Sequence, residues 1–177
     1  MAASIAPPSR FLYPVPHTLY PVFVRYVILF FALAGIVVSS LALHVHNSSG
    51  AVPCDLNARW DCGRVNRGSY ATLPGLLWHL RAARHPDSVT GVAPRTGFPV
   101  ATAGILGYLA IALAALFRRR WLTLLLATGG LAFAVYLSHI EADLLETWCL
   151  YCVISQGIIA LIFLLSLVTV FIRPRTT

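Results

Sequence analysis

The stretch ETWCLYCVISQGIIALIFLLSLVTVFI, residues 146–172, begins as a polar, acidic segment and continues as a long apolar run. From Leu150 to Ile172 the run contains 23 residues and no charge. The hydrocarbon core of a bilayer is about 30 Å thick, and a helix needs about 20 apolar residues to cross it. The run therefore predicts a transmembrane helix, and a C-x-x-C pair, Cys149 and Cys152, lies where this helix begins.

Three earlier runs, residues 26–43, 99–117 and about 121–140, are also long enough to span a bilayer. The chain of 177 residues is 58% hydrophobic and 11% charged, whereas a soluble domain carries about 25% charged residues. The first run is longer than the apolar core of a signal peptide, which has about 7–15 residues, so we interpret it as a retained helix. The predicted fold class is an all-α membrane protein, a four-transmembrane-helix bundle.

Arginines indicate how this bundle is oriented. The chain has 13 Arg, no Lys and 6 acidic residues, and the arginines flank apolar runs, which is typical of topology signals and not of a nucleic-acid partner. The triplet at 118–120 is the whole connection between the second and third helices, and Arg25, Arg173 and Arg175 fall on the same side. Both termini are therefore predicted to be cytoplasmic, with all four cysteines on the exterior side of the membrane.

The remaining sequence divides into a tail and one domain. Residues 1–24 predict a flexible cytoplasmic tail, and residues 25–173 predict a single domain whose exterior loop, residues 44–98, is the sizeable polar segment. Within this loop four leucines recur at helical spacing and predict a short amphipathic helix that lies on the bilayer or caps the bundle. These leucines are Leu73, Leu76, Leu77 and Leu80.

Two cysteine pairs offer the clearest chemistry. Cys54 and Cys62 have seven residues between them in the exterior loop, so the loop closes easily. Cys149 and Cys152 are three residues apart on a helix, which places them on one face within disulfide reach. Because a helix N-terminus favours a thiolate, we predict that the pKa of Cys149 is lowered.

Three interpretations of these cysteines remain open. In the first, the loop pair is a structural disulfide and the helix pair fills the core. In the second, all four bind zinc, although C-x₇-C differs from the usual half-site spacing. In the third, one pair takes electrons from an exterior dithiol and passes them to the other. The third interpretation explains why the C-x-x-C pair lies where a lipophilic acceptor can reach it.

Several motifs resemble those of the vitamin K epoxide reductase family, over about residues 26–170. They are SLALHVH, CDLNARWDCGRVNRGSYA, GILGY and VYLSHIEADLLETWCLYC. Two loop cysteines followed by a C-x-x-C at the last of four spans is the family's order. A DsbB-type oxidase follows the same logic but carries its C-x-x-C in the first exterior loop.

The resemblance implies a role for each cysteine. Cys152 would lie beside a quinone, and Cys149 would form a mixed disulfide with Cys62. Cys54 would meet an exterior thiol protein, which in bacterial members is a DsbA-like thioredoxin-fold protein, expected here as a separate chain. The electron acceptor would be ubiquinone or menaquinone, a substrate from the membrane, with no metal involved.

The predicted quinone-binding residues are Asn66, Ser69, Tyr136 and Gln156. The family usually has Ser or Thr six residues after the second loop cysteine, where this chain has Gly68 followed by Ser69. Gln156 occupies the position of a Tyr in an animal enzyme, one turn beyond Cys152, and its alternative role is an interhelical hydrogen bond. These differences favour reduction of a quinone over reduction of an epoxide.

Quinone reduction also consumes two protons. His139, Glu141 and Asp143, near the exterior end of the third helix, are candidates for a proton relay, although polar groups there are often simply solvated. The predicted function is thus a membrane thiol–disulfide oxidoreductase that transfers electrons to a quinone. The alternatives are a vitamin K quinone or epoxide reductase, and a non-catalytic membrane protein with a structural disulfide.

Overall fold

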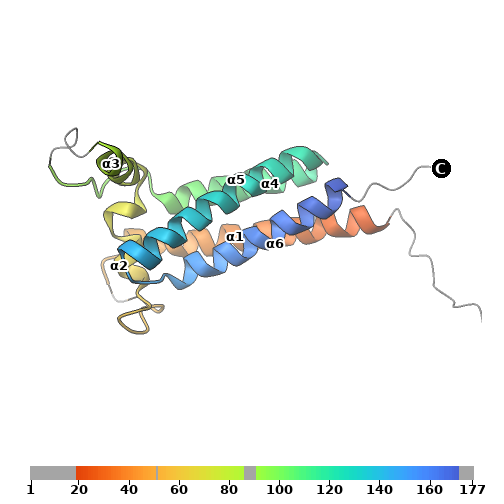
Figure 1. Cartoon of the computed structure of the whole chain (residues 1–177). Helices are drawn as coiled ribbons and strands as arrows, with labels where there is room; N and C mark the ends of the chain where they lie inside the picture. The colour runs from red at the N-terminus through yellow and green to blue at the C-terminus, as the bar shows by residue number, and fades with distance from the viewer. Residues whose placement is uncertain (1–18, 51, 86–90, 172–177) are drawn as a thin grey trace, which may run out of the picture.

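A computed structural model describes residues 19–50, 52–85 and 91–171 of the chain (Figure 1). These residues form helices joined by loops, and their β-structure is limited to isolated bridges. The elements are α1 (Leu19–Asn47), α2 (Cys62–Asn66), η1 (Ser69–Ala71), α3 (Leu73–Arg84), α4 (Val100–Leu116), α5 (Arg120–His139), the π-helical turn η3 (Ile140–Leu144) and α6 (Leu150–Phe171). The all-α prediction is confirmed for the part of the chain that the structure describes.

The four longest helices, α1, α4, α5 and α6, run side by side as an elongated bundle (Figure 1). Among the described residues, three helical stretches are long and apolar enough to cross a membrane: 22–47, 120–144 and 150–171. Helix α4 is apolar but shorter, with 17 residues. Phe23, Phe30 and Leu125 are 66–69% exposed on the outside of the bundle, as expected of side chains that face lipid.

Side chains from all four long helices form the core of the bundle. They are Val24, Ile28, Ala32, Tyr108, Ile111, Ala115, Ala127, Ile158, Ile159 and Ile162. Tyr108 of α4 lies against Gly35 of α1, where an added Cβ would come within 2.5 Å of the tyrosine ring. Its hydroxyl bonds to the Ser155 carbonyl and hydroxyl oxygens at 2.8 and 2.9 Å. One side chain thereby ties α4 to both α1 and α6.

The predicted boundaries hold for three helices and are wrong for the first. The described ends of α4, α5 and α6 agree with prediction to within one residue. Helix α1 begins at Leu19, so the predicted tail is wrong for residues 19–24, while residues 1–18 lie outside the described part. Pro21 falls in the first turn, where a missing N–H breaks no intrahelical hydrogen bond. Helix α1 also continues past residue 43 to Asn47, through His44 and His46.

The short elements α2, η1 and α3 gather at one end of the bundle, whereas α1 begins and α6 ends at the other (Figure 1). Thr72 precedes α3, and its hydroxyl accepts a hydrogen bond from the Gly75 N–H. An added Cβ at Gly75 would come within 1.9 Å of the Ser69 carbonyl oxygen, so glycine permits α3 to pack on η1. The described part of the predicted exterior loop is therefore a folded cap on the bundle.

The connection between α5 and α6 contains the π-helical turn η3. The Leu145 N–H bonds to the Ile140 carbonyl oxygen at 3.0 Å, five residues earlier. Glu146 then adopts a positive φ of 51°, which ends the helical run. Such π-turns occur frequently at functional sites, and this one carries Glu141, which is only 3% exposed.

Candidate active site

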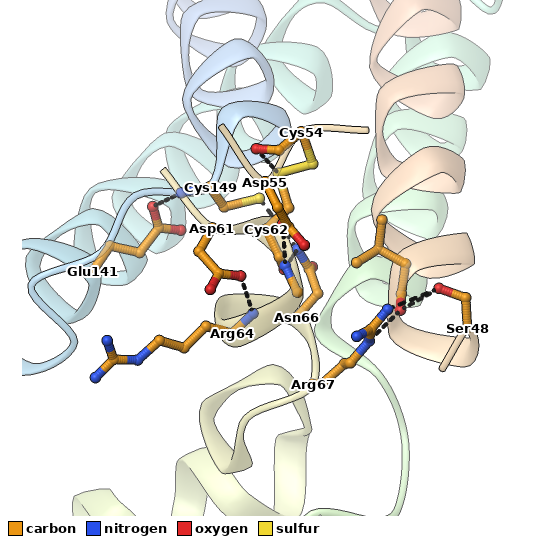
Figure 2. The surroundings of a disulfide bond; sticks show 12 residues. Ser48, Cys54, Asp55, Asp61, Cys62, Arg64, Asn66, Arg67, Glu141 and Cys149 are labelled. Atoms are coloured by element: carbon orange, nitrogen blue, oxygen red, sulfur yellow. Dashed lines mark hydrogen bonds between the residues drawn. A yellow bond between two sulfur atoms is a disulfide. The ribbon is translucent and has the colours of Figure 1, made fainter. Parts of the chain in front are cut away.

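All four cysteines lie at the capped end of the bundle, and Figure 2 shows three of them. Cys54 and Cys62 form a disulfide with their Cα atoms 5.8 Å apart, whereas Cys149 and Cys152 are thiols. Cys54, Cys62 and Cys149 are at most 3% exposed and belong to one buried cluster, against which Cys152 packs. The fold therefore joins two pairs that are far apart in sequence into one apolar site.

A short main-chain pairing holds the loop pair next to the helix pair. The Trp148 N–H donates to the Arg59 carbonyl oxygen at 2.8 Å, and the Asp61 N–H donates to the Trp148 carbonyl oxygen at 3.2 Å. This pairing aligns the residue before Cys62 with the residue before Cys149. Main-chain atoms form this pairing, so the pattern of side chains in the sequence did not predict it.

Helix α2 begins at Cys62, and two carboxylates stabilise its start (Figure 2). The Asp61 side chain accepts a hydrogen bond from the Arg64 N–H at 2.7 Å, and Asp55 accepts one from the Gly63 N–H at 3.0 Å. Acidic caps satisfy free N–H groups and favour the positive end of the helix dipole. The caps thus fix the direction of the backbone that carries Cys62.

Asn66 connects the two cysteine pairs directly (Figure 2). Its side-chain amide donates to the Cys62 carbonyl oxygen at 3.0 Å and to the Cys149 sulfur at 3.2 Å. Asn66 is 7% exposed, and its own carbonyl oxygen is hydrogen-bonded to the His46 ring at 2.5 Å. A residue predicted to bind quinone therefore contacts the cysteine pairs.

The surroundings of Cys149 lower the pKa of its thiol. The largest cause is the hydrogen bond from the Cys152 thiol, and the Asn66 amide acts in the same direction, while burial opposes both. A hydrogen bond donated to sulfur stabilises the thiolate more than the thiol. The direction agrees with the sequence prediction, but the main cause is the neighbouring thiol, which the helix-terminus argument did not include.

The three candidate proton-relay residues occupy different environments. The His139 ring and the Asp143 carboxylate form an ion pair at the surface, with side chains 67% and 60% exposed. Glu141 is buried, and its carboxylate accepts a hydrogen bond from the Cys149 N–H at 3.0 Å (Figure 2). Only Glu141 of the three is in contact with the cysteine site in the described structure.

A cavity of about 420 Å³ opens beside Cys152 within the bundle. Its walls come from α1, α4, α5 and α6, and α2 and η1 contribute at the capped end. The lining is mainly apolar, and its polar members besides Cys152 are Ser39, His46, Asn66, Tyr70, Tyr108, Ser138, Glu141, Tyr151 and Ser155. A mainly apolar cavity of about 300–1,000 Å³ with a few polar groups is typical of a small-molecule site.

Of the predicted quinone-binding residues, Asn66 lines this cavity, whereas Ser69, Tyr136 and Gln156 are not among its lining residues. Ser69 instead hydrogen-bonds the His79 ring at 2.9 Å. Gln156 accepts a hydrogen bond from Ser138 of α5 at 2.6 Å, which is the interhelical alternative considered from the sequence.

Three lining tyrosines, Tyr70, Tyr108 and Tyr151, were not predicted. Tyr108 is the last residue of the GILGY motif, and that motif was the one sequence signal that pointed to it. Tyr70 lies in η1, an element that the sequence did not predict. Tyr70 stacks on His79, with ring centroids 3.8 Å apart. Burial raises the pKa of Tyr70 and lowers that of His79, so both rings are neutral near pH 7.

Glycines leave open space where α4 faces α5. Gly104 and Gly107 of α4, with Gly129 and Gly130 of α5, line the cavity. An added Cβ at Gly107 or Gly129 would meet no atom within 4 Å. The cavity therefore keeps its volume because glycine has no side chain to fill the space at these positions.

The loop cysteines and Asp55 are the one group in the described residues whose ligand atoms approach as metal ligands do, within 4.8 Å of one another. The sulfurs of Cys54 and Cys62 are bonded to each other, so they offer no thiolate to a metal. The group is a redox site and not a metal site.

Comparisons with known proteins agree with this geometry. No individual curated protein matches the chain significantly. A family model described as the vitamin K epoxide reductase family matches residues 26–167, which include both cysteine pairs, all of α4 and α5, and α1 and α6 except their outer ends. The apolar helices and paired cysteines are those of an integral membrane redox protein. The chain belongs to the vitamin K epoxide reductase family.

Proposed function

We propose that the protein is a quinone-dependent thiol–disulfide oxidoreductase. It takes electrons from an exterior thiol protein and passes them through Cys54–Cys62 and then Cys149–Cys152 to a membrane quinone. The observation that carries this proposal is the single buried cluster that holds both cysteine pairs at the mouth of an apolar cavity. A structural disulfide alone would not account for a thiol pair placed between that disulfide and the cavity.

The proposed topology has four spans, with α4 as the short one. The arginine turn at 118–120, the start of α1 and the end of α6 share one end of the bundle (Figure 1). Short loops rich in Arg stay cytoplasmic, so the cysteine end faces the exterior, the periplasm in a bacterial inner membrane. An exterior compartment is oxidising and allows disulfides to form.

Electron transfer occurs by thiol–disulfide exchange. The partner dithiol reduces the Cys54–Cys62 disulfide and becomes a disulfide itself. The Cys62 thiolate then attacks the Cys149 sulfur of an oxidised Cys149–Cys152 pair, forms a mixed disulfide and releases the Cys152 thiolate. Attack by Cys54 on Cys62 restores the loop disulfide and leaves Cys149 reduced. The structure corresponds to the state after this exchange, with a loop disulfide and two helix thiols.

The reduced helix pair then transfers two electrons to the quinone and returns to the disulfide. Cys152 is the donor, because it lines the cavity whereas Cys149 is fully buried beside the loop pair. The lowered pKa of Cys149 maintains a thiolate that closes the new disulfide. The protein supplies positioning and a water-poor cavity, and the quinone supplies the acceptor chemistry.

The thiol partner is a thioredoxin-fold protein of the DsbA-like kind. Cys54 is 3% exposed, so attack by a protein thiol requires the turn at 55–60 to move aside. Leu56 in this turn is 65% exposed and offers an apolar contact next to the disulfide.

The test is reduction of a soluble ubiquinone or menaquinone analogue by purified protein in the presence of a dithiol. The wild type should reduce the quinone, and Cys152→Ala should lose at least about a thousandfold in rate because the electron donor is removed. Full activity of Cys152→Ala would exclude the relay. Supplying vitamin K epoxide in place of quinone separates the epoxide reductase alternative, which alone would turn over with the epoxide.

A further inference from the structure

Glu141 is a buried carboxyl group without a cationic partner in the described part of the chain. It is 3% exposed, and the one ion pair among the described residues joins His139 to Asp143. A carboxylate that is buried without a positive partner is costly to fold. Its retention needs a reason other than stability, and its neighbours supply one.

This carboxyl group lies at the helix pair. Its Oε2 atom accepts a hydrogen bond from the Cys149 N–H at 3.0 Å, and the carboxyl group interacts electrostatically with the Cys152 thiol. Glu141 lines the quinone-sized cavity together with Cys152. One carboxyl group thus contacts the thiol that gives up electrons and the space where the acceptor is expected.

We propose that Glu141 is the acid–base residue of the quinone step: it takes the proton of the Cys152 thiol and delivers it to a quinone oxygen. This inference rests on the proposed function and deepens it by naming the residue that moves the proton. General acid–base transfer needs a group within hydrogen-bond reach of the proton that moves. Glu141 is held at the Cys149–Cys152 pair by the Cys149 N–H and lines the same cavity as Cys152, so it is placed to meet that condition when a quinone is bound.

The step balances in atoms and electrons. The Glu141 carboxylate accepts the Cys152 proton, and the Cys152 sulfur becomes a thiolate. The Cys149–Cys152 bond forms as two electrons pass to the quinone. Glu141 returns its proton to one quinone oxygen, and water supplies the proton for the other. A Cys149 thiolate, a Cys152 thiol, a quinone and one proton give a disulfide and a hydroquinone.

Glu141→Gln is the sharpest test, because its amide oxygen can still accept the Cys149 N–H but the side chain no longer exchanges a proton. The reduced enzyme is mixed with a soluble quinone analogue, and the single-turnover rate of quinone reduction is measured. We expect that rate to fall by about 10²–10⁴-fold, the range of general acid–base catalysis. Formation of the Cys62–Cys149 mixed disulfide, measured in a Cys54→Ala background, should stay within about threefold of the parent, since this step uses no proton from Glu141.

Glu146→Gln is the matched control. Glu146 lies in the same connection but is exposed to solvent, so both rates should equal those of the wild type. Equal losses in both steps for Glu141→Gln would indicate that Glu141 only positions Cys149, and would overturn the proposal. An unchanged quinone rate would overturn it as well.

Glu141→Asp covers the case in which the glutamine variant does not fold. It keeps the acid but withdraws it by one methylene, so the quinone step should slow by about tenfold or more while exchange continues. A full quinone rate in Glu141→Asp would contradict the proposal. The proposed function fails separately, if the wild type itself does not reduce the quinone or if Cys152→Ala does.

Discussion

The two cysteine pairs share one cluster, but different forces hold them. Cys54 and Cys62 lie in a loop that polar groups position: carboxylate caps, a main-chain pairing to residue 148 and the side chain of Arg67. Cys149 and Cys152 lie where a 22-residue apolar helix begins, and helix packing positions them. The loop pair is covered by elements of the cap, whereas Cys152 opens onto a cavity within the bundle.

This difference shows how one site could react both with a protein in water and with an acceptor in the membrane. Hydrogen bonds in the cap are local and can open one by one, as access by a protein thiol requires, since loops occupy the low-stability part of a fold. The helix pair needs no such opening to meet the proposed lipophilic acceptor, because Cys152 lines a cavity within the bundle. Each of the following predictions alters one side of this comparison.

The largest effect should come from removing one loop cysteine. Asn66 bridges Cys62 to Cys149, so Cys54→Ala should leave Cys62 free to form a trappable mixed disulfide with Cys149. Cys62→Ala should give no such species, because Cys54 is not held against Cys149. Mass spectrometry of non-reduced peptides distinguishes the two. A Cys54–Cys149 bond in Cys62→Ala at the level of the other variant would reverse the assignment.

The next largest effect should come from filling the cavity on the helix side. Gly129→Leu places a side chain in open space that lines the cavity. The leucine would take up space that the quinone needs, and a poorer fit in an apolar pocket is worth about 1–3 kcal/mol, so kcat/KM for quinone should fall by about ten- to a hundredfold, with thiol exchange unchanged. Gly157→Leu is the control, since Gly157 also faces open space but does not line the cavity. Equal losses in both variants would show that the cavity does not bind quinone.

A smaller effect is expected at the contact between the two pairs. Asn66→Leu removes a hydrogen bond to the Cys149 sulfur, and a bond to a charged group contributes about 1.5–3 kcal/mol. The pKa of Cys149 is lowered in the wild type, so its thiolate persists as pH falls until that pKa is crossed. Without Asn66 the loss of thiolate should begin at higher pH, and alkylation at a fixed pH below that pKa should slow by about tenfold.

This shift is measured as the alkylation rate of Cys149 against pH, with both the variant and its parent carrying Cys152→Ala to isolate one thiol. Both curves then lack the hydrogen bond from Cys152, so the difference between them reports Asn66 alone. Asn47→Ala, at the exposed end of α1, provides the control and should follow the parent curve. If the curves for Asn66→Leu and its parent superimpose, the Asn66 hydrogen bond does not lower the pKa of Cys149.

The smallest effect concerns the stability of the cap. Arg67 donates to the Val45 carbonyl, the Ser48 hydroxyl and the Gly50 carbonyl at 3.3, 3.2 and 2.7 Å (Figure 2). Arg67→Ala should lower the free energy of unfolding by about 1–2 kcal/mol, seen as a lower Tm in detergent. It should also raise the rate at which a small dithiol reduces Cys54–Cys62, because the cap opens more often.

Arg64→Ala is the matched control for the cap. The Arg64 side chain is exposed, and only its backbone N–H takes part in the α2 cap. Its Tm and its reduction rate should match those of the wild type. A destabilisation equal to that of Arg67→Ala would point to lost positive charge and not to the three hydrogen bonds.

Much of the bundle was readable from the sequence. The runs 99–117, 121–140 and 150–172 formed helices within one residue of the predicted bounds, because spanning a membrane sets both length and apolar content. The first helix is longer than its predicted run, 26–43, at both ends, because residues 19–25 and 44–47 continue the helix beyond the apolar stretch. The cysteines were found from spacing and order alone.

The four quinone-binding residues remain predictions, and the structure places them differently relative to the cavity. Asn66 is in the cavity wall, whereas Ser69, Tyr136 and Gln156 are not among the lining residues. Which face of a helix points inward depends on neighbours that are distant in sequence. Glu141 illustrates the same limit: the sequence grouped it with His139 and Asp143, and only the π-helical turn separated the buried carboxyl group from the exposed pair.

By itself the sequence determined the number of apolar helices, their order and the presence of two cysteine pairs, because these follow from hydropathy and from residue type and spacing. Only the tertiary structure decided that the pairs share one buried cluster, that Cys152 and not Cys149 lines the cavity, and that a carboxyl group contacts both. These facts depend on main-chain pairing and on how each helix is rotated about its axis, which together bring atoms from α1, α2, α5 and α6 close to one another. Neither can be inferred from the local sequence.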